Sequence, residues 1–205
     1  DAILNEARNG PYRASIQYQA AQVLLNMNDV AGAHTRLQMI VKDYPSTYAA
    51  YQAMGILLNV GLQIDTYQQG LIAYSNEDYQ AAINAFNTYT SQTGAAPAEV
   101  LMMLGRAYRE VGNSQAAITT FQTVIDVYPT DPAFGEAWLE QGRTLFLSGD
   151  VPGAIQKYAA LATQHPDTPQ GAEALWRAGY LYSTQNDTQN ALATFDILGQ
   201  MYPGS

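Results

Sequence analysis

Apolar and polar residues follow one pattern three times in the second half of the chain. Each copy holds two runs in which apolar residues recur at intervals of three and four, the spacing that places them on one face of an α-helix. A proline closes each copy, and the interval from Pro129 to Pro166 equals that from Pro166 to Pro203. The copies read Leu101-x-x-Leu104-Gly105-x-x-Tyr108 with Ala117-x-x-x-Phe121, Trp138-x-x-Gln141-Gly142-x-x-Leu145 with Ala154-x-x-x-Tyr158, and Leu175-x-x-Ala178-Gly179-x-x-Tyr182 with Ala191-x-x-x-Phe195. This pattern predicts an array of helix pairs.

The glycine of each copy indicates that the two helices of a pair approach closely. A glycine inside a helix costs about 1 kcal/mol relative to alanine, so a glycine at the same position in three copies implies a steric reason. An alanine occupies the matching position of each second helix, and an aromatic residue four positions later fills the space between neighbouring repeats. The proline ends the second helix because its ring cannot continue a helix.

Two looser copies lie upstream, separated by a stretch that breaks the period. One carries Ala20-Ala21, Leu24, Ala33, Leu37 and Pro45, and the other carries Gly70, Ala73, Ala82 and Phe86 with Gly94 at the proline position. Between them, Ser46 can cap a helix start and Gly61 can close a helix. We therefore expect one extra helix near 46–61.

These motifs resemble the tetratricopeptide repeat, whose pattern is a large residue, Leu-Gly, Tyr, Ala, Phe and a closing Pro. The resemblance covers nearly the whole chain. It implies an all-α fold, a right-handed superhelical solenoid of antiparallel helix pairs. We expect a single solenoid over 1–205, with a partial helix at 1–9, repeats at about 14–45, 63–94, 98–131, 135–168 and 172–205, and an inserted helix at 46–61.

Charge and composition exclude several function classes. The formal net charge of −9 disfavours nucleic acid and anionic membranes as partners. The chain has no cysteine, which excludes disulfides and thiolate metal sites. We expect no cofactor, no metal and no membrane insertion. The chain begins at Asp1 without a methionine, which indicates a processed protein or a piece of a longer one. Few lysines and a neutral polar surface favour a periplasmic or extracellular protein.

A second resemblance is carried by the segment from Asp43-Tyr44-Pro45-Ser46-Thr47-Tyr48 through Gly70-Leu71 to Phe86. It looks like the helical N-terminal region of bacterial soluble lytic transglycosylases. The Tyr-Pro junctions between repeats also resemble those of envelope assembly lipoproteins and cell-division coordinators. The motifs of a transglycosylase catalytic domain are absent. The resemblance implies either a non-catalytic scaffold of an envelope or secreted protein, or the substrate-guiding arm of a peptidoglycan hydrolase.

The residues offer little support for catalysis. His34 and His165 are the only histidines and fall in different repeats, and His165 occupies the position that Tyr44, Tyr128 and Tyr202 hold elsewhere, which indicates a packing role. An acidic residue recurs at the start of each first helix, where it complements the helix dipole. Asn186-Asp187-Thr188 matches a glycosylation acceptor but is expected to be a turn. We expect no catalytic residue and no enzyme.

The best functional candidate is a surface. In this family the first helices line the concave face, and Arg and aromatic side chains are frequent anchors of recognition. The alternative is that Arg106 pairs with Glu110, and Arg143 with Glu140 or Glu136, as ordinary helix-face pairs. Matching positions place nine candidates on that face for a protein or peptide partner: Tyr67, Tyr74, Met102, Arg106, Arg109, Arg143, Phe146, Trp176 and Tyr180.

The two ends of the chain suggest a third function. Solenoids need terminal repeats with a polar outer face to remain soluble. Apolar residues occupy both ends here, so either the chain continues or copies stack end to end into a filament. The residues expected in such self-assembly are Ile3, Leu4, Phe195, Leu198 and Met201. The sequence thus leaves three partners open: another protein, a second copy of the chain, and peptidoglycan.

Overall fold

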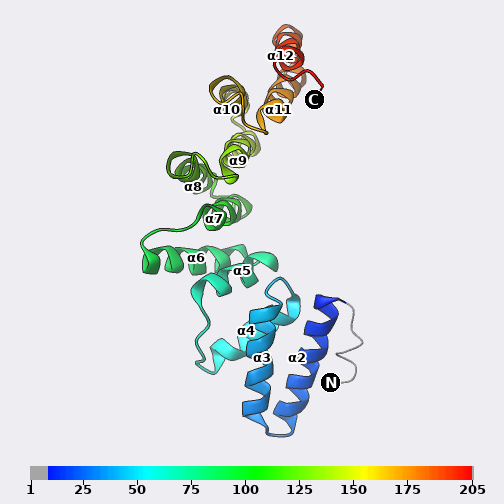
Figure 1. The fold of residues 1–205 in the computed structure, drawn as a ribbon, viewed down its shortest axis with the longest axis vertical. Helices are drawn as coiled ribbons and strands as arrows, with labels where there is room; N and C mark the ends of the chain where they lie inside the picture. The colour runs from blue at the N-terminus through cyan, green and yellow to red at the C-terminus, as the bar shows by residue number, and fades with distance from the viewer. Residues whose placement is uncertain (1–8, 205) are drawn as a thin grey trace. The chain divides into compact units, whose positions relative to one another are not determined.

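The computed structural model describes residues 9–204, and this part of the chain is helical throughout with no strand (Figure 1). The all-α repeat fold is therefore confirmed. The expected partial helix at 1–9 falls almost wholly outside the described residues. The helices are α2 (Gly10–Asn26), α3 (Val30–Asp43), α4 (Tyr48–Asn59), α5 (Thr66–Ser75), α6 (Tyr79–Thr93), α7 (Ala98–Glu110), α8 (Ser114–Val127), α9 (Ala133–Leu147), α10 (Val151–Gln164), α11 (Gly171–Thr184) and α12 (Thr188–Met201).

Side-chain caps set most helix starts. Asn113, Asp150 and Asp187 each accept a hydrogen bond from the backbone N–H three residues later, and α8, α10 and α12 begin directly after them. At the N-terminal end, the apolar spacing predicts a helix over 13–27, but α2 begins earlier, at Gly10. The reason is that Asn9 accepts a hydrogen bond from Tyr12 N at 2.9 Å, so the cap precedes the apolar pattern.

The chain divides into two compact units, residues 1–95 and 96–205, and each is described by itself. Unit 1 contains α2 to α6, with a core that includes Leu37, Ile40, Leu57 and Ile72. The extra helix expected near 46–61 is present as α4, which packs against α3 and more lightly against α2 and α5. The hydroxyl of Tyr51 in α4 donates to Asp78 Oδ2 at 2.7 Å and so ties α4 to the start of α6.

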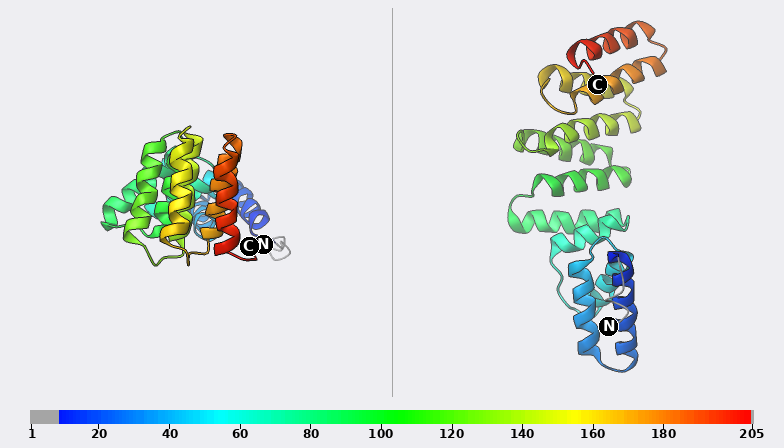
Figure 2. Two further views of the ribbon diagram at one scale, coloured as in Figure 1. Left: turned by 90° about the horizontal axis from the view of Figure 1, so that it is seen from above. Right: turned by 45° about the vertical axis from the view of Figure 1, so that its right-hand side comes forward.

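Unit 2 contains α7 to α12, which form three consecutive helix pairs (Figure 2). Each helix packs against the next one along the chain, and α7 also contacts α9. The aromatic residue of each second helix lies against the glycine of its own first helix, since an added Cβ at Gly142 would come 2.5 Å from Tyr158 Cε1. The close approach that the glycines indicated is therefore present.

The tyrosines at the repeat junctions tie the end of a helix pair to the segment that precedes the same pair. The hydroxyl of Tyr128 donates to Ala96 O at 2.7 Å, and that of Tyr202 donates to Pro166 O at 2.9 Å. His165 stands at the equivalent position and packs its ring against Phe134 and Trp138, with centroids 4.9 and 5.6 Å away. This contact agrees with the packing role expected of His165.

Candidate functional site

Two adjoining cavities open between the first helices α9 and α11 of unit 2, and together they form what we call the α9–α11 groove. The larger cavity has a volume of about 410 Å³ and the smaller about 220 Å³. Arg143, Glu173 and Arg177 line both cavities, which makes the groove continuous. One end of this groove is aromatic and the other is charged.

The aromatic end is built from two rings on one helix. Trp176 and Tyr180 lie four residues apart on α11 and stack with centroids 5.5 Å apart and planes 5° apart. They remain 53% and 50% exposed, and Phe146 and Leu147 beside them on α9 are exposed as well. Exposed apolar side chains that gather around a groove are typical of a protein interaction site. Three of these four residues, Phe146, Trp176 and Tyr180, are among those predicted for the concave face.

The charged end contains two arginines in different environments. Arg177 donates to Glu173 Oε1 from Nε at 3.0 Å and from Nη2 at 2.6 Å, and its guanidinium lies over the Tyr158 ring at 5.8 Å. Burial would lower the pKa of Arg177, but hydrogen bonds to Tyr158 and Glu173 outweigh it and raise that pKa. Arg143 forms no ion pair within residues 9–204. Its guanidinium is therefore available to a carboxylate of a partner.

An ion-pair cluster joins α7 to α9 next to the groove. Arg106 Nε donates to Glu140 Oε1 at 2.9 Å, Arg106 Nη2 also contacts Glu136, and Arg109 Nη1 contacts Glu140 Oε2. Burial alone would raise the pKa of Glu140, but the hydrogen bonds from Arg109 and Arg106 outweigh burial and lower it. Because successive first helices lie side by side, these arginines pair across helices. These pairs between α7 and α9 were not among the expected ones, and within residues 9–204 Arg143 forms no ion pair with Glu140 or Glu136.

The other predicted residues lie away from the groove. Met102 is 4% exposed and the Arg109 side chain 7% exposed, so both are packed inside unit 2. Tyr67 and Tyr74 belong to α5 of unit 1, where they contact Tyr89 and Tyr79. On α12, Phe195 and Met201 are exposed and Leu198 is half-buried. Ile3 and Leu4 lie outside the described residues.

Arg177, Glu173 and Tyr158 also line the groove and were not among the predicted residues. The spacing of Glu173 and Arg177, four residues apart on a first helix, was a usable signal, because such a pair marks one helix face. Tyr158 was predicted only as a core residue between repeats. Among residues 9–204, no cluster of three or more His, Asp or Glu side chains is arranged for a metal ion, and no helix has the length and apolarity to cross a bilayer.

Comparison with known proteins places the chain in a family. Two family models, both described as tetratricopeptide repeat, match residues 102–169 and residues 16–47 and 173–205, which together exceed half of the chain. No curated protein matches the sequence.

Among solved structures, the chain is similar to YrrB, described as a TPR protein with an unusual peptide-binding site, with 20% identity, coverage of 92% of this chain and 86% of that one, and a TM-score of 0.51. It is also similar to MamA from Desulfovibrio magneticus RS-1, with 15% identity, coverage of 94% and 97%, and a TM-score of 0.53. At these identities the structures support the fold alone. The family models and the repeated helix pairs agree, and the chain belongs to the tetratricopeptide repeat family.

Proposed function

We propose that this protein is a non-catalytic scaffold that binds a protein or peptide partner through the α9–α11 groove. The observation that carries the proposal is the exposed Trp176–Tyr180 stack beside Arg143, which forms no ion pair within residues 9–204. The aromatic rings offer apolar area and the guanidinium offers bidentate hydrogen bonds to a carboxylate. A partner segment with an apolar side chain next to an acidic one fits both ends of the groove.

The test starts from partners captured from an extract of the producing cell and identified by mass spectrometry. The dissociation constant of each purified partner is then measured for the unchanged chain, Arg143→Ala, the double variant Trp176→Ala/Tyr180→Ala, and Tyr48→Ala. Tyr48 is an exposed aromatic on α4 and serves as the control. The groove variants should weaken binding about tenfold or more, the range of interface anchors. Equal constants for all four proteins would contradict the proposal.

The non-catalytic part of the proposal rests on the lack of a catalytic arrangement among residues 9–204. His165 packs against aromatic rings, and Glu140 is held by two arginines. The purified chain should release no soluble fragments from peptidoglycan. If the chain guides that substrate, the protein should sediment together with peptidoglycan. Fragment release that disappears on substitution of one acidic residue would refute the non-catalytic assignment.

A periplasmic or extracellular location is part of the same proposal. It is supported by the polar composition of the chain, which has only two lysines, Lys42 and Lys157, and abundant Gln, Asn, Thr and Tyr. Fractionation of the producing cell with a specific antibody tests it. Recovery of the protein in the cytoplasmic fraction alone would contradict this location.

Self-assembly is a second candidate, favoured by the exposed apolar residues Leu192, Ile197 and Met201 on α12. Sedimentation velocity of the unchanged chain and of Leu192→Glu compares the oligomers directly, since Leu192 is exposed and its substitution leaves the interior of unit 2 intact. Oligomers that disperse in the variant support this candidate. A chain that is monomeric at high concentration refutes it.

A further inference from the structure

A second groove in unit 2 lies between the second helices α8 and α10, over α9, and we call it the α8–α10 groove. Its volume is about 440 Å³. Ile118, Leu145 and Ala160 give it apolar walls, while Trp138, Gln141 and Lys157 give it polar groups. It shares no lining residue with the α9–α11 groove. The two grooves are therefore separate features of the unit.

Two buried polar atoms at this groove have no hydrogen-bond partner within residues 9–204. They are the indole donor Nε1 of Trp138, a residue 8% exposed, and the amide acceptor Oε1 of Gln141, a residue 4% exposed. The other amide atom of Gln141 is used, since Nε2 donates to Ile118 O at 3.1 Å and to Gln122 Oε1 at 3.2 Å. These bonds fix the orientation of the amide and leave its oxygen unpartnered. An unpartnered buried polar atom lowers stability.

Lys157 lies over the Trp138 ring. Its ammonium lies 3.7 Å from the centroid of the Trp138 ring, and Nζ donates to Gln122 Oε1 at 3.4 Å. Burial lowers the pKa of Lys157 to about 8, although the negative charge of Asp126 counteracts part of the effect. Lys157 forms no ion pair within residues 9–204. A carboxylate beside Nζ would compensate the desolvated charge.

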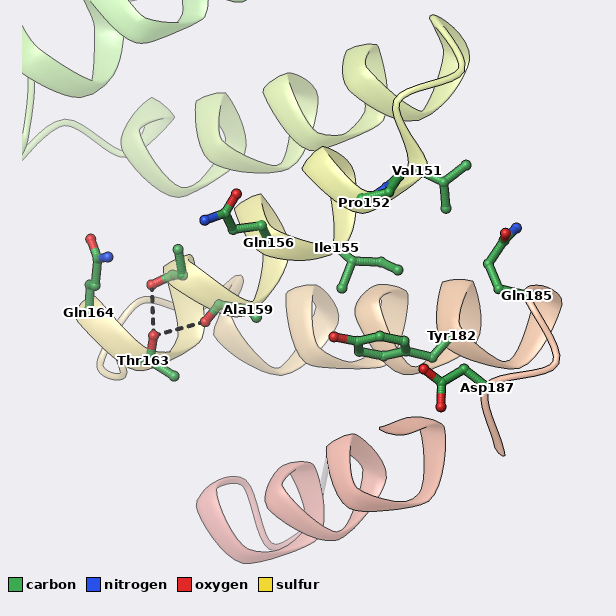
Figure 3. A pocket seen from close by; sticks show the side chains of 11 residues that line it. Val151, Pro152, Ile155, Gln156, Ala159, Thr163, Gln164, Tyr182, Gln185 and Asp187 are labelled. Atoms are coloured by element: carbon green, nitrogen blue, oxygen red, sulfur yellow. Dashed lines mark hydrogen bonds between the residues drawn. The ribbon is translucent and has the colours of Figure 1, made fainter. Parts of the chain in front are cut away.

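The neighbouring repeat shows that the fold does not require these polar groups. The neighbouring cavity is lined by α10, by Tyr182 of α11 and by the turn that follows α11. It has a volume of about 580 Å³ and is drawn in Figure 3. Its apolar positions correspond, with Ile155 and Tyr182 where the first groove has Ile118 and Leu145. Its polar positions do not. The residues that stand where Trp138, Gln141, Lys157 and Gln122 would be are Leu175, Ala178, Thr194 and Ala159.

We propose that the α8–α10 groove is a second binding site, for an acidic peptide segment of a partner protein. A backbone carbonyl of the segment accepts a hydrogen bond from Trp138 Nε1, an adjacent amide N–H donates to Gln141 Oε1, and an acidic side chain pairs with Lys157. The flexible arm of Lys157 swings off the indole to admit the segment. A peptide amide supplies both an acceptor and a donor, which are the groups that the two buried atoms lack.

The charge around the groove favours a peptide with one carboxylate over a polyanion. The chain carries a net charge of −9, and Asp150 lines the groove near its single ammonium. A polyanion such as a nucleic acid would meet repulsion around one cation. One carboxylate on a peptide matches the single ammonium, and aliphatic neighbours match the apolar walls.

The experiment uses the indole N–H signals of the full chain in ¹⁵N-resolved NMR. The chain has two tryptophans, and Trp176→Phe assigns the remaining signal to Trp138. The probe is N-acetyl-Leu-Asp-Leu-amide, and N-acetyl-Leu-Lys-Leu-amide is the charge-reversed control. The acidic probe should shift the Trp138 signal downfield in a saturable manner. This shift should persist in Arg143→Ala, which distinguishes it from any binding of the probe in the α9–α11 groove. An unmoved Trp138 signal, or equal shifts with both probes, would overturn the proposal.

Variants that adopt the residues of the neighbouring groove give an independent test. Gln141→Ala and Lys157→Thr should each weaken binding of the acidic probe about tenfold, whereas Arg143→Ala, in the other groove, should not change it. Lys157→Thr keeps the assay decisive if Gln141→Ala fails to fold, because Lys157 is only half-buried. Undiminished binding by Lys157→Thr would overturn the proposal.

Discussion

The ring of Phe121 fills the space that Gly105 leaves open on α7. A Cβ atom added at Gly105 would lie 2.6 Å from Phe121 Cε1, closer than such atoms approach in proteins. Gly105→Ala should therefore destabilise unit 2 by about 1–3 kcal/mol, since the steric cost exceeds the gain of about 1 kcal/mol in helix propensity. The urea midpoint followed by tryptophan fluorescence measures it, because Trp138 and Trp176 both lie in unit 2.

Gly199→Ala is the matched control for this prediction. Gly199 lies inside α12, and an added Cβ there would meet no atom within 4 Å. Only the propensity term remains, so this variant should be more stable by up to about 1 kcal/mol. If both variants shift the midpoint in the same direction, the steric reason for the repeated glycine is wrong.

Phe121 and Phe195 occupy the same position of their repeats in different surroundings. Phe121 is fully buried, whereas Phe195 on the last helix is 36% exposed. Phe121→Ala should cost about 3–5 kcal/mol because it leaves a cavity between packed helices. Phe195→Ala should cost less than about 2 kcal/mol, since its ring is only partly removed from water. Gln115→Ala, on the exposed side of α8, should change the urea midpoint little. Equal losses for the two phenylalanines would contradict the repeat assignment.

The sequence predicts this fold well because each repeat carries its own boundary signals. The apolar spacing predicts helices over 114–127, 133–147, 151–164 and 188–201, and α8, α9, α10 and α12 have these bounds. A capping residue or turn precedes each of these helices, and the apolar period ends with the helix. Errors of one to three residues occur where the cap lies outside the apolar pattern, as at Asn9, or where a left-handed Gly94 extends the last turn of α6.

The candidate site is less predictable because it depends on contacts between repeats. The repeat period places Arg106 on a first helix. It does not predict that the next first helix brings Glu136 and Glu140 within reach of Arg106. The same limit applies to Met102. Helix spacing assigns it to the concave face, but packing within unit 2 buries its side chain. The unpartnered atoms of Trp138 and Gln141 have no sequence signal except their departure from the residues of the other copies.

Glu140→Gln tests the ion-pair cluster between α7 and α9. The Glu140 side chain is 12% exposed, so its loss of charge leaves Arg109 and Arg106 poorly compensated, at a cost of about 3 kcal/mol or more. The folded state lowers the pKa of Glu140, so the stabilisation is complete above its ordinary value of 4.5 and is lost as pH falls through the folded pKa. The difference in urea midpoint between the two proteins should accordingly shrink in acid.

Glu173→Gln is the control for the cluster, since Glu173 pairs with Arg177 at an exposed position. Surface pairs of this kind contribute about 1 kcal/mol or less. A Glu140→Gln variant no less stable than Glu173→Gln would show that the cluster does not stabilise unit 2.

Lys157→Thr should change how the stability of unit 2 depends on pH. The folded-state pKa of Lys157 is about 8 against an ordinary value of 10.5, so between these values the unfolded chain binds more protons than the folded one. The free energy of unfolding that Lys157 contributes therefore rises with pH across this window, as the buried ammonium loses its charge. Threonine does not titrate, so the unchanged chain should gain stability relative to Lys157→Thr from about pH 8 to pH 10.

Tyr158 and Tyr202, whose pKa values burial raises, oppose this trend in both proteins and cancel in the comparison. If the difference between the two urea midpoints stays constant over this range, the prediction is wrong. The Trp138 ring and Asp126 would then stabilise the charged form of Lys157 as strongly as water does, and its pKa would not be lowered.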